Sequence, residues 1–225
     1  MFSIKLFKKC CTKEWQYIFE THKQQKLVKA KEMIFNEGDP VEGIYFIESG
    51  KIKVLSKAFN GENRIIRLAA DGMILGHRGL HSKFYPISAE ALTDSVITFV
   101  PIKVFLNILK ANPELAIYLI NFMSDELKES EIRMKSLLIQ DPRIRIAMIL
   151  VKLIDCFGYL PEPETKLSFT LSRTDIANMA GTTYETTIRT IALFKKKKLI
   201  RLEGKEIHII NEIELRSLSG SVFKE

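Results

Sequence analysis

The stretch from residue 113 to about 140 constrains the fold most. Pro113 follows Asn112, as at a helix start, and no glycine or further proline occurs before Pro142. Apolar residues recur along the stretch at alternating spacings of four and three, interrupted only by one serine, at positions Ala116, Ile120, Met123, Leu127, Ser130, Met134 and Leu137. This spacing is typical of a coiled-coil seam. We therefore predict a helix as far as about Gln140 that pairs with a second copy of the chain. Packing of the seam on the chain's own sheet is the alternative.

The predicted dimer interface consists of the larger apolar residues of this seam. These are Ile120, Met123, Leu127, Met134 and Leu137. Leu127 and Met134 are expected at its centre.

Residues 26–101 have a different pattern, with short runs of alternating apolar residues broken by glycine turns. Two such runs flank Ser49-Gly50, which predicts a hairpin, and Asn60-Gly61 predicts a second turn. An antiparallel sandwich or roll of about 75 residues is expected here.

Downstream of the long helix, Asp141-Pro142 begins another helix that ends at Gly158, and residues 166–171 are expected to form a short strand. Two helix starts follow, ten residues apart. Ser172 with Asp175, and Thr182 with Glu185, match the capping box. In this motif each of the two side chains accepts a hydrogen bond from the backbone N–H of the other residue.

Between these two starts, the glycine of "NMAGT" supplies the turn of a helix-turn-helix. Residues 199–210 alternate about Glu203-Gly204, which predicts a hairpin wing.

The basic charge is concentrated in this last region. The chain has a net charge of +7, and residues 173–201 contain seven basic and two acidic residues, a net charge of +5. This concentration favours nucleic acid as the partner. An adaptor that binds a protein through the same segment is the alternative. Steep salt dependence would indicate DNA.

Four motifs together carry a family resemblance. "GDPVEGIYFIESGKIKV", "GMILGHRGL", "NPELAIYLINFMSDEL" and "LSRTDIANMAGTTYETTIRTIALFKKKKLI" occur in the order and spacing of the Crp/Fnr transcription regulators. The resemblance covers about residues 15–215. It implies a cyclic-nucleotide-binding-type β-roll, a dimerising helix, and a winged helix-turn-helix that binds palindromic promoter DNA, with RNA polymerase as a further partner.

The expected fold is therefore α+β, with three parts. A jelly-roll-like antiparallel β-roll with an N-terminal helix is expected at 1–111, the dimerisation helix at 112–140, and the winged helix-turn-helix domain at 141–225.

Helical spacing separates two faces of the second helix of the motif. Thr187, Ile191 and Phe194 share a face that can pack on the first helix. The opposite face is expected to contact bases through Tyr184, Glu185, Ile188 and Arg189. Glu185 and Arg189 match the family's recognition helix, although Glu185 also fits the capping role. The expected phosphate contacts are Ser172, Arg173, Thr183, Lys195, Lys196 and Lys197.

The expected effector pocket lies around the glycine-rich turn. Its candidate residues are Gly76, His77, Arg78, Gly79, Leu80, Ile87, Ser88 and Ser130. In the cyclic-AMP members, a glutamate binds the ribose and an arginine followed by serine binds the phosphate. Here His77 and Ile87 replace the glutamate and the arginine, and Ser88 is retained. Because a buried phosphate without a partner is unfavourable, we expect an effector other than cyclic AMP, or none.

No cofactor, metal site or catalytic residue is expected. The adjacent Cys10 and Cys11 lack the spacing of the family's iron-sulfur cluster. His77 and His81 are only two candidate ligands for haem or a metal. A cupin-like metal enzyme is the distant alternative function, but no nearby carboxylate completes its two-histidine, one-carboxylate site. We therefore expect that the protein is not an enzyme.

The location and the redox state of the thiols follow from simple features. The N-terminus lacks the apolar stretch of a signal peptide, and no window approaches the length of a membrane span. A cytoplasmic protein without membrane contact is expected. Cys10, Cys11 and Cys156 are expected to be free thiols.

Overall fold

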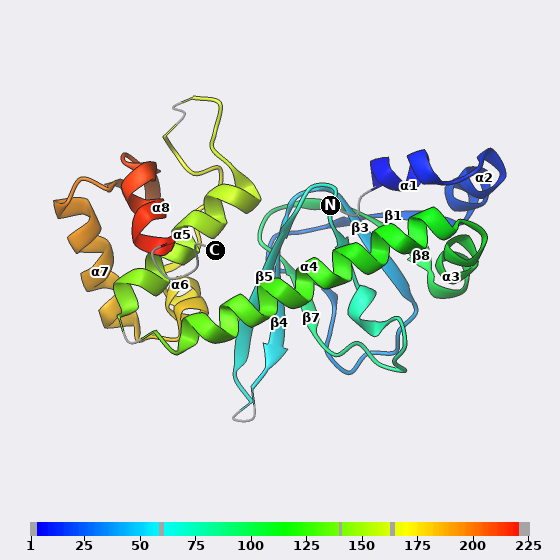
Figure 1. The fold of residues 1–225 in the computed structure, drawn as a ribbon, viewed down its shortest axis with the longest axis horizontal. Coiled ribbons are helices and arrows are strands. Elements are labelled where there is room, and N and C mark those ends of the chain that lie inside the picture. The colour runs from blue at the N-terminus through cyan, green and yellow to red at the C-terminus, as the bar shows by residue number, and fades with distance from the viewer. Residues whose placement is uncertain (1–3, 59–60, 140, 163–164, 221–225) are drawn as a thin grey trace. The chain divides into compact units, whose positions relative to one another are not determined.

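The computed structural model describes residues 4–58, 61–139, 141–162 and 165–220. The chain divides into two compact units, Met1–Glu129 and Ser130–Glu225. Helix α4, Pro113–Leu137, is continuous and contributes residues to both units (Figure 1). None of the described helices is long and apolar enough to cross a membrane.

The first unit is built on two antiparallel sheets of four strands each. One sheet has the order β1 (Gln24–Val28), β8 (Ser95–Pro101), β3 (Gly43–Ser49) and β6 (Ile74–Leu75). The other has the order β2 (Met33–Phe35), β7 (Ser88–Ala91), β4 (Lys51–Lys57) and β5 (Asn63–Ala70). Residues from both sheets, among them Ile47, Ile97, Val54 and Ala89, pack in one buried core. The predicted antiparallel roll is confirmed.

The predicted hairpin at Ser49-Gly50 is wrong, because β3 and β4 belong to different sheets. Gly50 has a φ of 131°, and a Cβ added there would lie 2.0 Å from Oγ of Ser95. Glycine is required because the chain changes sheets here against Ser95. Alternation identified both strands, but it does not specify which strands pair.

The second predicted turn joins strands that do pair. β4 and β5 are antiparallel neighbours, with Lys57 opposite Asn63. Gly61 has a φ of 81°, which suits a turn glycine. Asn60 lies outside the described residues.

Helices cover one of the sheets. Helices α1 (Ile4–Cys10), α2 (Lys13–His22), α3 (Ile102–Ala111) and the start of α4 share a core cluster with strand β3. Phe7, Phe19, Phe46 and Phe105 are fully buried in it. The three cysteines are free, and burial raises the pKa of the Cys11 thiol to about 11.

Helix α4 ends at Leu137, before the predicted end near Gln140, which lies outside the described residues. Leu115 and Leu119 are buried against the helical core of the first unit. Four residues of the predicted seam are instead exposed, namely Ile120 (65%), Leu127 (62%), Met134 (58%) and Leu137 (51%). For Ile120 and Leu127, which belong to the first unit, packing on the chain's own sheet is therefore wrong.

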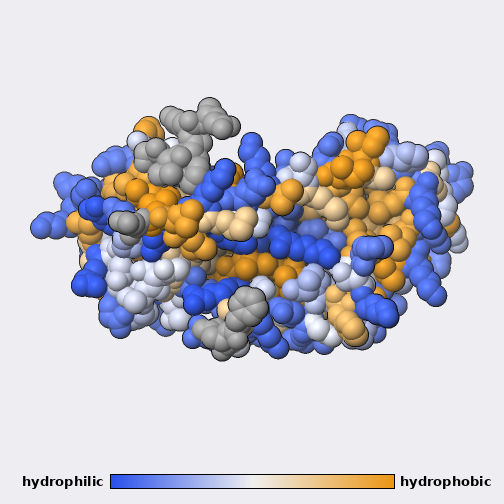
Figure 2. Space-filling model, turned by 60° about the horizontal axis from the view of Figure 1, so that its bottom comes forward, coloured by the Kyte–Doolittle hydropathy of each residue, from blue (hydrophilic) through white to orange (hydrophobic). Residues whose placement is uncertain are grey.

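Met123 differs from the other seam residues, because it is half-buried against the same helical core. Two exposed apolar residues outside the predicted seam are Ile117 and Leu138. Figure 2 shows apolar patches exposed among hydrophilic side chains on one face of the molecule. Pairing of α4 with a second copy stays a prediction.

The described residues of the second unit form four further helices and a two-stranded wing. These are α5 (Pro142–Phe157), α6 (Arg173–Ala180), α7 (Tyr184–Lys196), β9 (Ile200–Glu203), β10 (Glu206–Ile209) and α8 (Glu212–Gly220). Asp141 caps α5 by accepting a hydrogen bond from Arg143 N, and α5 ends before Gly158, as predicted. The antiparallel pair of β9 and β10 confirms the predicted wing.

The predicted strand at 166–171 is absent, since only isolated bridges involve Lys166 and Leu167 in this described stretch. Its backbone bonds go to different neighbours, with Leu167 N donating to Ile207 O at 3.1 Å and Ser168 N to Gly158 O at 3.0 Å, so they form no continuous ladder, and two side chains add further bonds. The Ser168 hydroxyl donates to Phe157 O at 2.6 Å, and the Thr170 hydroxyl accepts from Ile207 N at 3.2 Å.

Candidate nucleic-acid interface and sensor site

The turn between α6 and α7 has the geometry of a helix-turn-helix. Ser172 begins α6 by accepting a hydrogen bond from Asp175 N at 3.0 Å. Gly181 ends α6 in the left-handed region, with a φ of 57°, and Thr182 N donates to Ala177 O. These bonds satisfy the last carbonyl groups of α6 and confirm the predicted glycine turn.

The start of α7 corrects one prediction. Thr183, and not Thr182, is the N-cap, because its hydroxyl accepts from Thr186 N at 3.2 Å. Thr182 is already used to close the preceding turn. Glu185 therefore occupies the second helical position and does not complete a capping box. The capping alternative for Glu185 is wrong, and its carboxylate is exposed.

The two faces of α7 are those that the spacing predicts. Thr187, Ile191 and Phe194 are buried, at 0%, 2% and 1% exposure. The opposite face is exposed and carries Tyr184, Glu185, Ile188 and Arg189. Arg189 lies 3.5 Å from the Thr186 hydroxyl, and its guanidinium group faces solvent. This face thus offers one carboxylate, one guanidinium group and two apolar surfaces for recognition.

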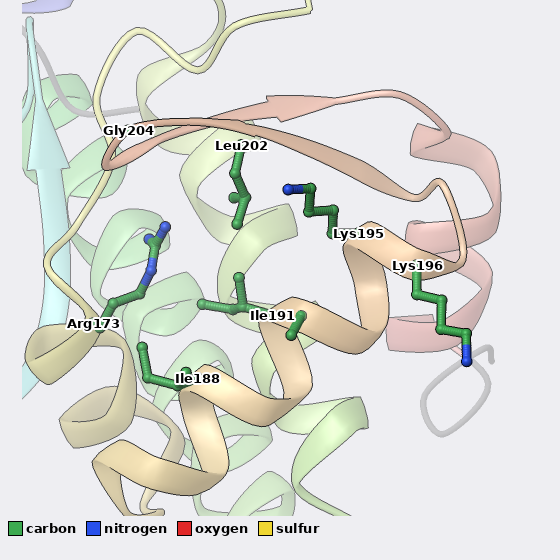
Figure 3. A pocket seen from close by; sticks show the side chains of 8 residues that line it. Arg173, Ile188, Ile191, Lys195, Lys196, Leu202 and Gly204 are labelled. Carbon is green, nitrogen blue, oxygen red and sulfur yellow. The ribbon is translucent and has the colours of Figure 1, made fainter.

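A hollow of about 580 Å³ lies between α7 and the wing (Figure 3). Ile188, Ile191 and Leu202 line its apolar part. The Arg173 guanidinium group points toward the wing and donates to Lys205 O at 3.3 Å. Lys195 extends toward the hollow, whereas Lys196 points away from it. Basic groups therefore flank an apolar floor beside the recognition face.

A separate cluster in the first unit surrounds Glu126 of α4. Arg67 Nε donates to Glu126 Oε1 at 2.9 Å, and Arg78 Nη2 donates to Oε2 at 3.1 Å. His77 Nε2 lies 3.8 Å from Oε2 and is 3% exposed. His77 and Arg78 lie in the short 3-10 helix η1 (His77–Gly79), which follows Gly76 at a φ of 82°. The glycine-rich turn thus directs two side chains to one carboxylate.

The electrostatics of this cluster favour an ionised Glu126 and a neutral His77. Burial raises the pKa of Glu126, but the guanidinium groups of Arg67 and Arg78, with the His77 ring 3.8 Å away, more than offset it and hold the pKa of the carboxyl at about 2. Burial lowers the pKa of the His77 imidazole below its usual range. The cluster is therefore two guanidinium cations, one carboxylate and an uncharged ring at neutral pH.

Comparison with known proteins identifies the family. The family model of the cyclic nucleotide-binding domain matches residues 25–112, and that of the Crp-like helix-turn-helix domain matches residues 144–218. The transcriptional activator protein anr of Pseudomonas aeruginosa is 30% identical over 201 residues, covering 89% of this chain and 82% of that protein. The chain belongs to the Crp/Fnr family of transcription regulators. It is a DNA-binding regulator and not an enzyme.

A second relative and a solved structure are also similar to the chain. Electron transport regulator A of Shewanella oneidensis is 28% identical over 198 residues, covering 88% of this chain and 79% of that protein. The solved structure of FixK2 from Bradyrhizobium japonicum has a TM-score of 0.77 at 20% identity and covers 87% of this chain and 96% of that one. That structure shows the same fold.

As in other Crp/Fnr regulators, the DNA-binding residues are expected in the second unit, where all the phosphate candidates lie. The hydroxyls of Ser172 and Thr183 serve as helix caps, and Arg173 is tied to the wing. Lys195, Lys196 and Lys197 are exposed at the end of α7. Their contacts with phosphate stay a prediction.

The effector-pocket candidates are not all brought together. Ile87 is buried in the core between the sheets, and the Ser88 hydroxyl accepts from Glu37 N at 2.7 Å. Leu80 packs with the helical core, and Gly79 lies against Val41. Ser130 belongs to the second unit, where its hydroxyl lies 3.5 Å from Arg133 Nη2.

Sequence reasoning missed Arg67 and Glu126. Glu126 lies on the predicted dimerisation helix but outside its seam, and Arg67 lies within a strand of alternating residues. No motif links the two positions. In the part of the chain that the structure describes, no group of three or more His, Cys, Asp or Glu side chains could hold a metal ion.

Replacing Lys196 and Lys197 with alanine should weaken binding to specific and random DNA alike. Each lost phosphate contact releases one counterion fewer, so the slope of log affinity against log salt should decrease by roughly one per contact in each subunit. Fluorescence anisotropy at several salt concentrations measures both quantities. Lys103→Ala with Lys110→Ala, on helix α3 of the first unit, is the matched control. An unchanged slope in the α7 variant would contradict the phosphate assignment.

Replacing Glu126 with glutamine should lower stability at pH 7 by no more than about 3 kcal/mol, the upper limit from the lowered pKa. Because the folded-state pKa is about 2 and the ordinary value is 4.5, the stabilisation is present above pH 4.5 and is lost as the pH falls toward 2. Urea unfolding of both proteins at pH 7, 4 and 2.5 tests this. A stability difference that grows on acidification would contradict it.

Proposed function

We propose that the protein acts in the cytoplasm as a homodimer that binds palindromic promoter DNA through two copies of α7 and acts together with RNA polymerase. The exposed face of α7 carries the proposal, because Thr183 performs the capping and leaves Glu185 available for DNA. The exposed apolar residues of α4, Ile120, Leu127 and Met134, support the homodimer.

Each residue of the α7 face suits a particular base edge. The planar guanidinium group of Arg189 can donate two hydrogen bonds to O6 and N7 of guanine. The Glu185 carboxylate can accept from N4 of cytosine, and the apolar surfaces of Ile188 and Tyr184 can contact the methyl group of thymine. Lys195, Lys196, Lys197, Arg173, Ser172 and Thr183 would then hold the flanking phosphates.

We also propose that cyclic AMP is not the effector and that no metal or haem cofactor is required. Ile87 occupies the position of the family's phosphate-binding arginine and is buried in an apolar core. Arg78, the nearest cation on the turn, is paired with Glu126. Titration calorimetry with cyclic AMP should therefore show affinity no tighter than the millimolar range, about 4 kcal/mol of binding free energy. Low-micromolar binding would refute this part of the proposal.

Selection of bound DNA from a random pool, by the purified protein without added effector, tests the function. We expect enrichment of an inverted repeat whose half-site centres lie about 34 to 36 Å apart. Binding to the selected DNA should weaken steeply with salt. A pool without an enriched sequence, or binding that is insensitive to salt, would contradict the proposal and favour the protein-binding adaptor.

A further inference from the structure

The Glu126 carboxylate is held as a bound anion would be. It accepts hydrogen bonds from Arg67 Nε at 2.9 Å and Arg78 Nη2 at 3.1 Å, from two separate elements, β5 and η1. The Glu126 side chain is 17% exposed, and that of Arg67 is 11% exposed. Arginine pairs of this kind commonly bind carboxylate or phosphate ligands. In this site, the ligand group comes from the protein's own helix α4.

The positive charges of Arg67 and Arg78 need an anion to balance them. Arg67 also donates to Ile74 O at 3.2 Å, and its guanidinium group lies over the Phe122 ring at 5.7 Å. Arg67 is therefore fixed by other contacts and would stay in place without Glu126. Removing the carboxylate that pairs with both guanidinium groups would bring two like charges into opposition in a partly buried site.

His77 provides an independent indication that the site accommodates a polar ligand. Its side chain is 3% exposed, and neither ring nitrogen has a hydrogen-bond partner among the described residues. Buried polar groups without a partner are rare. The ring packs edge-on against Phe122 at 5.0 Å, which holds it next to the carboxylate. A small anion free to approach the ring could accept the hydrogen bond that Glu126 leaves unmade at 3.8 Å.

We propose that Arg67, Arg78 and His77 form a binding site for a small carboxylate anion and that Glu126 fills this site as a tethered ligand. The chain thus supplies its own anion, and α4 is anchored to the β-roll without a small molecule. An external carboxylate can enter only when the Glu126 side chain is removed. The consequence for regulation, DNA binding without an added effector, rests on the proposed function.

The first experiment asks whether removal of Glu126 opens the site. Thermal unfolding of the full chain with Glu126→Ala is measured in sodium chloride and in sodium formate or acetate at equal ionic strength. The variant should melt below the wild type in chloride, and formate should raise its Tm in a saturable way that the wild type does not show. Asp125→Ala, which removes the neighbouring exposed carboxylate, should respond alike to both salts.

Two further variants identify the groups that bind the anion. Glu126→Gln keeps the space filled, so it should melt lower than the wild type without recovering in formate. Adding Arg78→Ala to Glu126→Ala should abolish the formate effect. If Glu126→Ala is recovered folded only from formate buffer, that result supports the site. Equal behaviour of Glu126→Ala in chloride and formate, including failure to fold in both, overturns it.

The second experiment tests the regulatory consequence with the selected DNA. In chloride, Glu126→Ala should bind this DNA about 5-fold to 150-fold more weakly than the wild type, the usual range of coupling between sites, and formate should restore binding. Rescue of Tm without any change in DNA affinity would overturn the regulatory step and leave the anion site standing. Failure of the wild type to bind any selected DNA would refute the proposed function, whereas the thermal test concerns the first unit alone.

Discussion

Replacing Leu127 and Met134 together with glutamate should convert the protein to monomers and lower its affinity for the palindromic site by about 10² to 10⁴. Both side chains are more than half exposed on α4, one heptad apart, and would face their symmetry mates across an apolar seam. Glutamate at these positions would place like charges opposite each other in that seam. A monomer retains one α7 and loses the gain from binding two half-sites at once.

Sedimentation velocity measures the oligomeric state, and anisotropy compares a palindrome with a single half-site. The double variant should bind the two DNAs with similar affinity. Tyr118→Glu is the matched control, because Tyr118 is an exposed apolar residue of α4 about 200° around the helix axis from Ile120. The control should remain dimeric. A double variant that is still dimeric would show that α4 is not the interface.

The sequence predicted which segments are strands better than it predicted which strands pair. Alternation located β3 and β4, but pairing depends on which edges meet in space, and Gly50 directs the chain from one sheet to the other. The wing was predictable because its two strands are joined by a tight turn at Gly204, so partner and turn are both local.

The recognition helix shows the same limit at the scale of one residue. Its buried and exposed faces follow from helical spacing alone, and the structure agrees with them. The residue at which the helix begins could not be predicted from the sequence, because Thr182 and Thr183 are both suitable N-caps. The choice depends on the hydrogen bond of Thr182 N to Ala177 O, which closes the turn after α6.

The cluster around Glu126 could not be predicted from the sequence. Arg67, His77 and Glu126 come from a strand, a turn and a helix, and no spacing rule relates them. The substitutions His77 and Ile87 indicated only that cyclic AMP would lack its usual partners. That Glu126 supplies the carboxylate for Arg67 and Arg78 emerges only from the three-dimensional arrangement.

Replacing Arg189 with alanine should weaken binding to the selected palindrome by about 30-fold to 10⁴-fold, since each half-site loses about 1 to 3 kcal/mol. The guanidinium group is exposed on the α7 face and has a 3.5 Å contact with the Thr186 hydroxyl, so the substitution leaves the buried face of α7 intact. Base preference should relax at one position in each half-site, where the wild type selects guanine.

Arg189→Lys separates base recognition from charge, because lysine keeps the cation but lacks the planar pair of donors. It should bind random DNA as the wild type does while losing preference for guanine. Competition binding with the selected site and with single-base variants, at two salt concentrations, measures affinity, base preference and salt slope together. If Arg189→Ala retained the wild-type base preference while the Lys196 and Lys197 variant changed it, the base-contacting face of α7 would have to be assigned to its C-terminal end. If Arg189→Ala and Arg189→Lys both lose the preference for guanine, while the variant with alanine at Lys196 and Lys197 keeps it, base recognition is assigned to Arg189 and phosphate binding to the lysines.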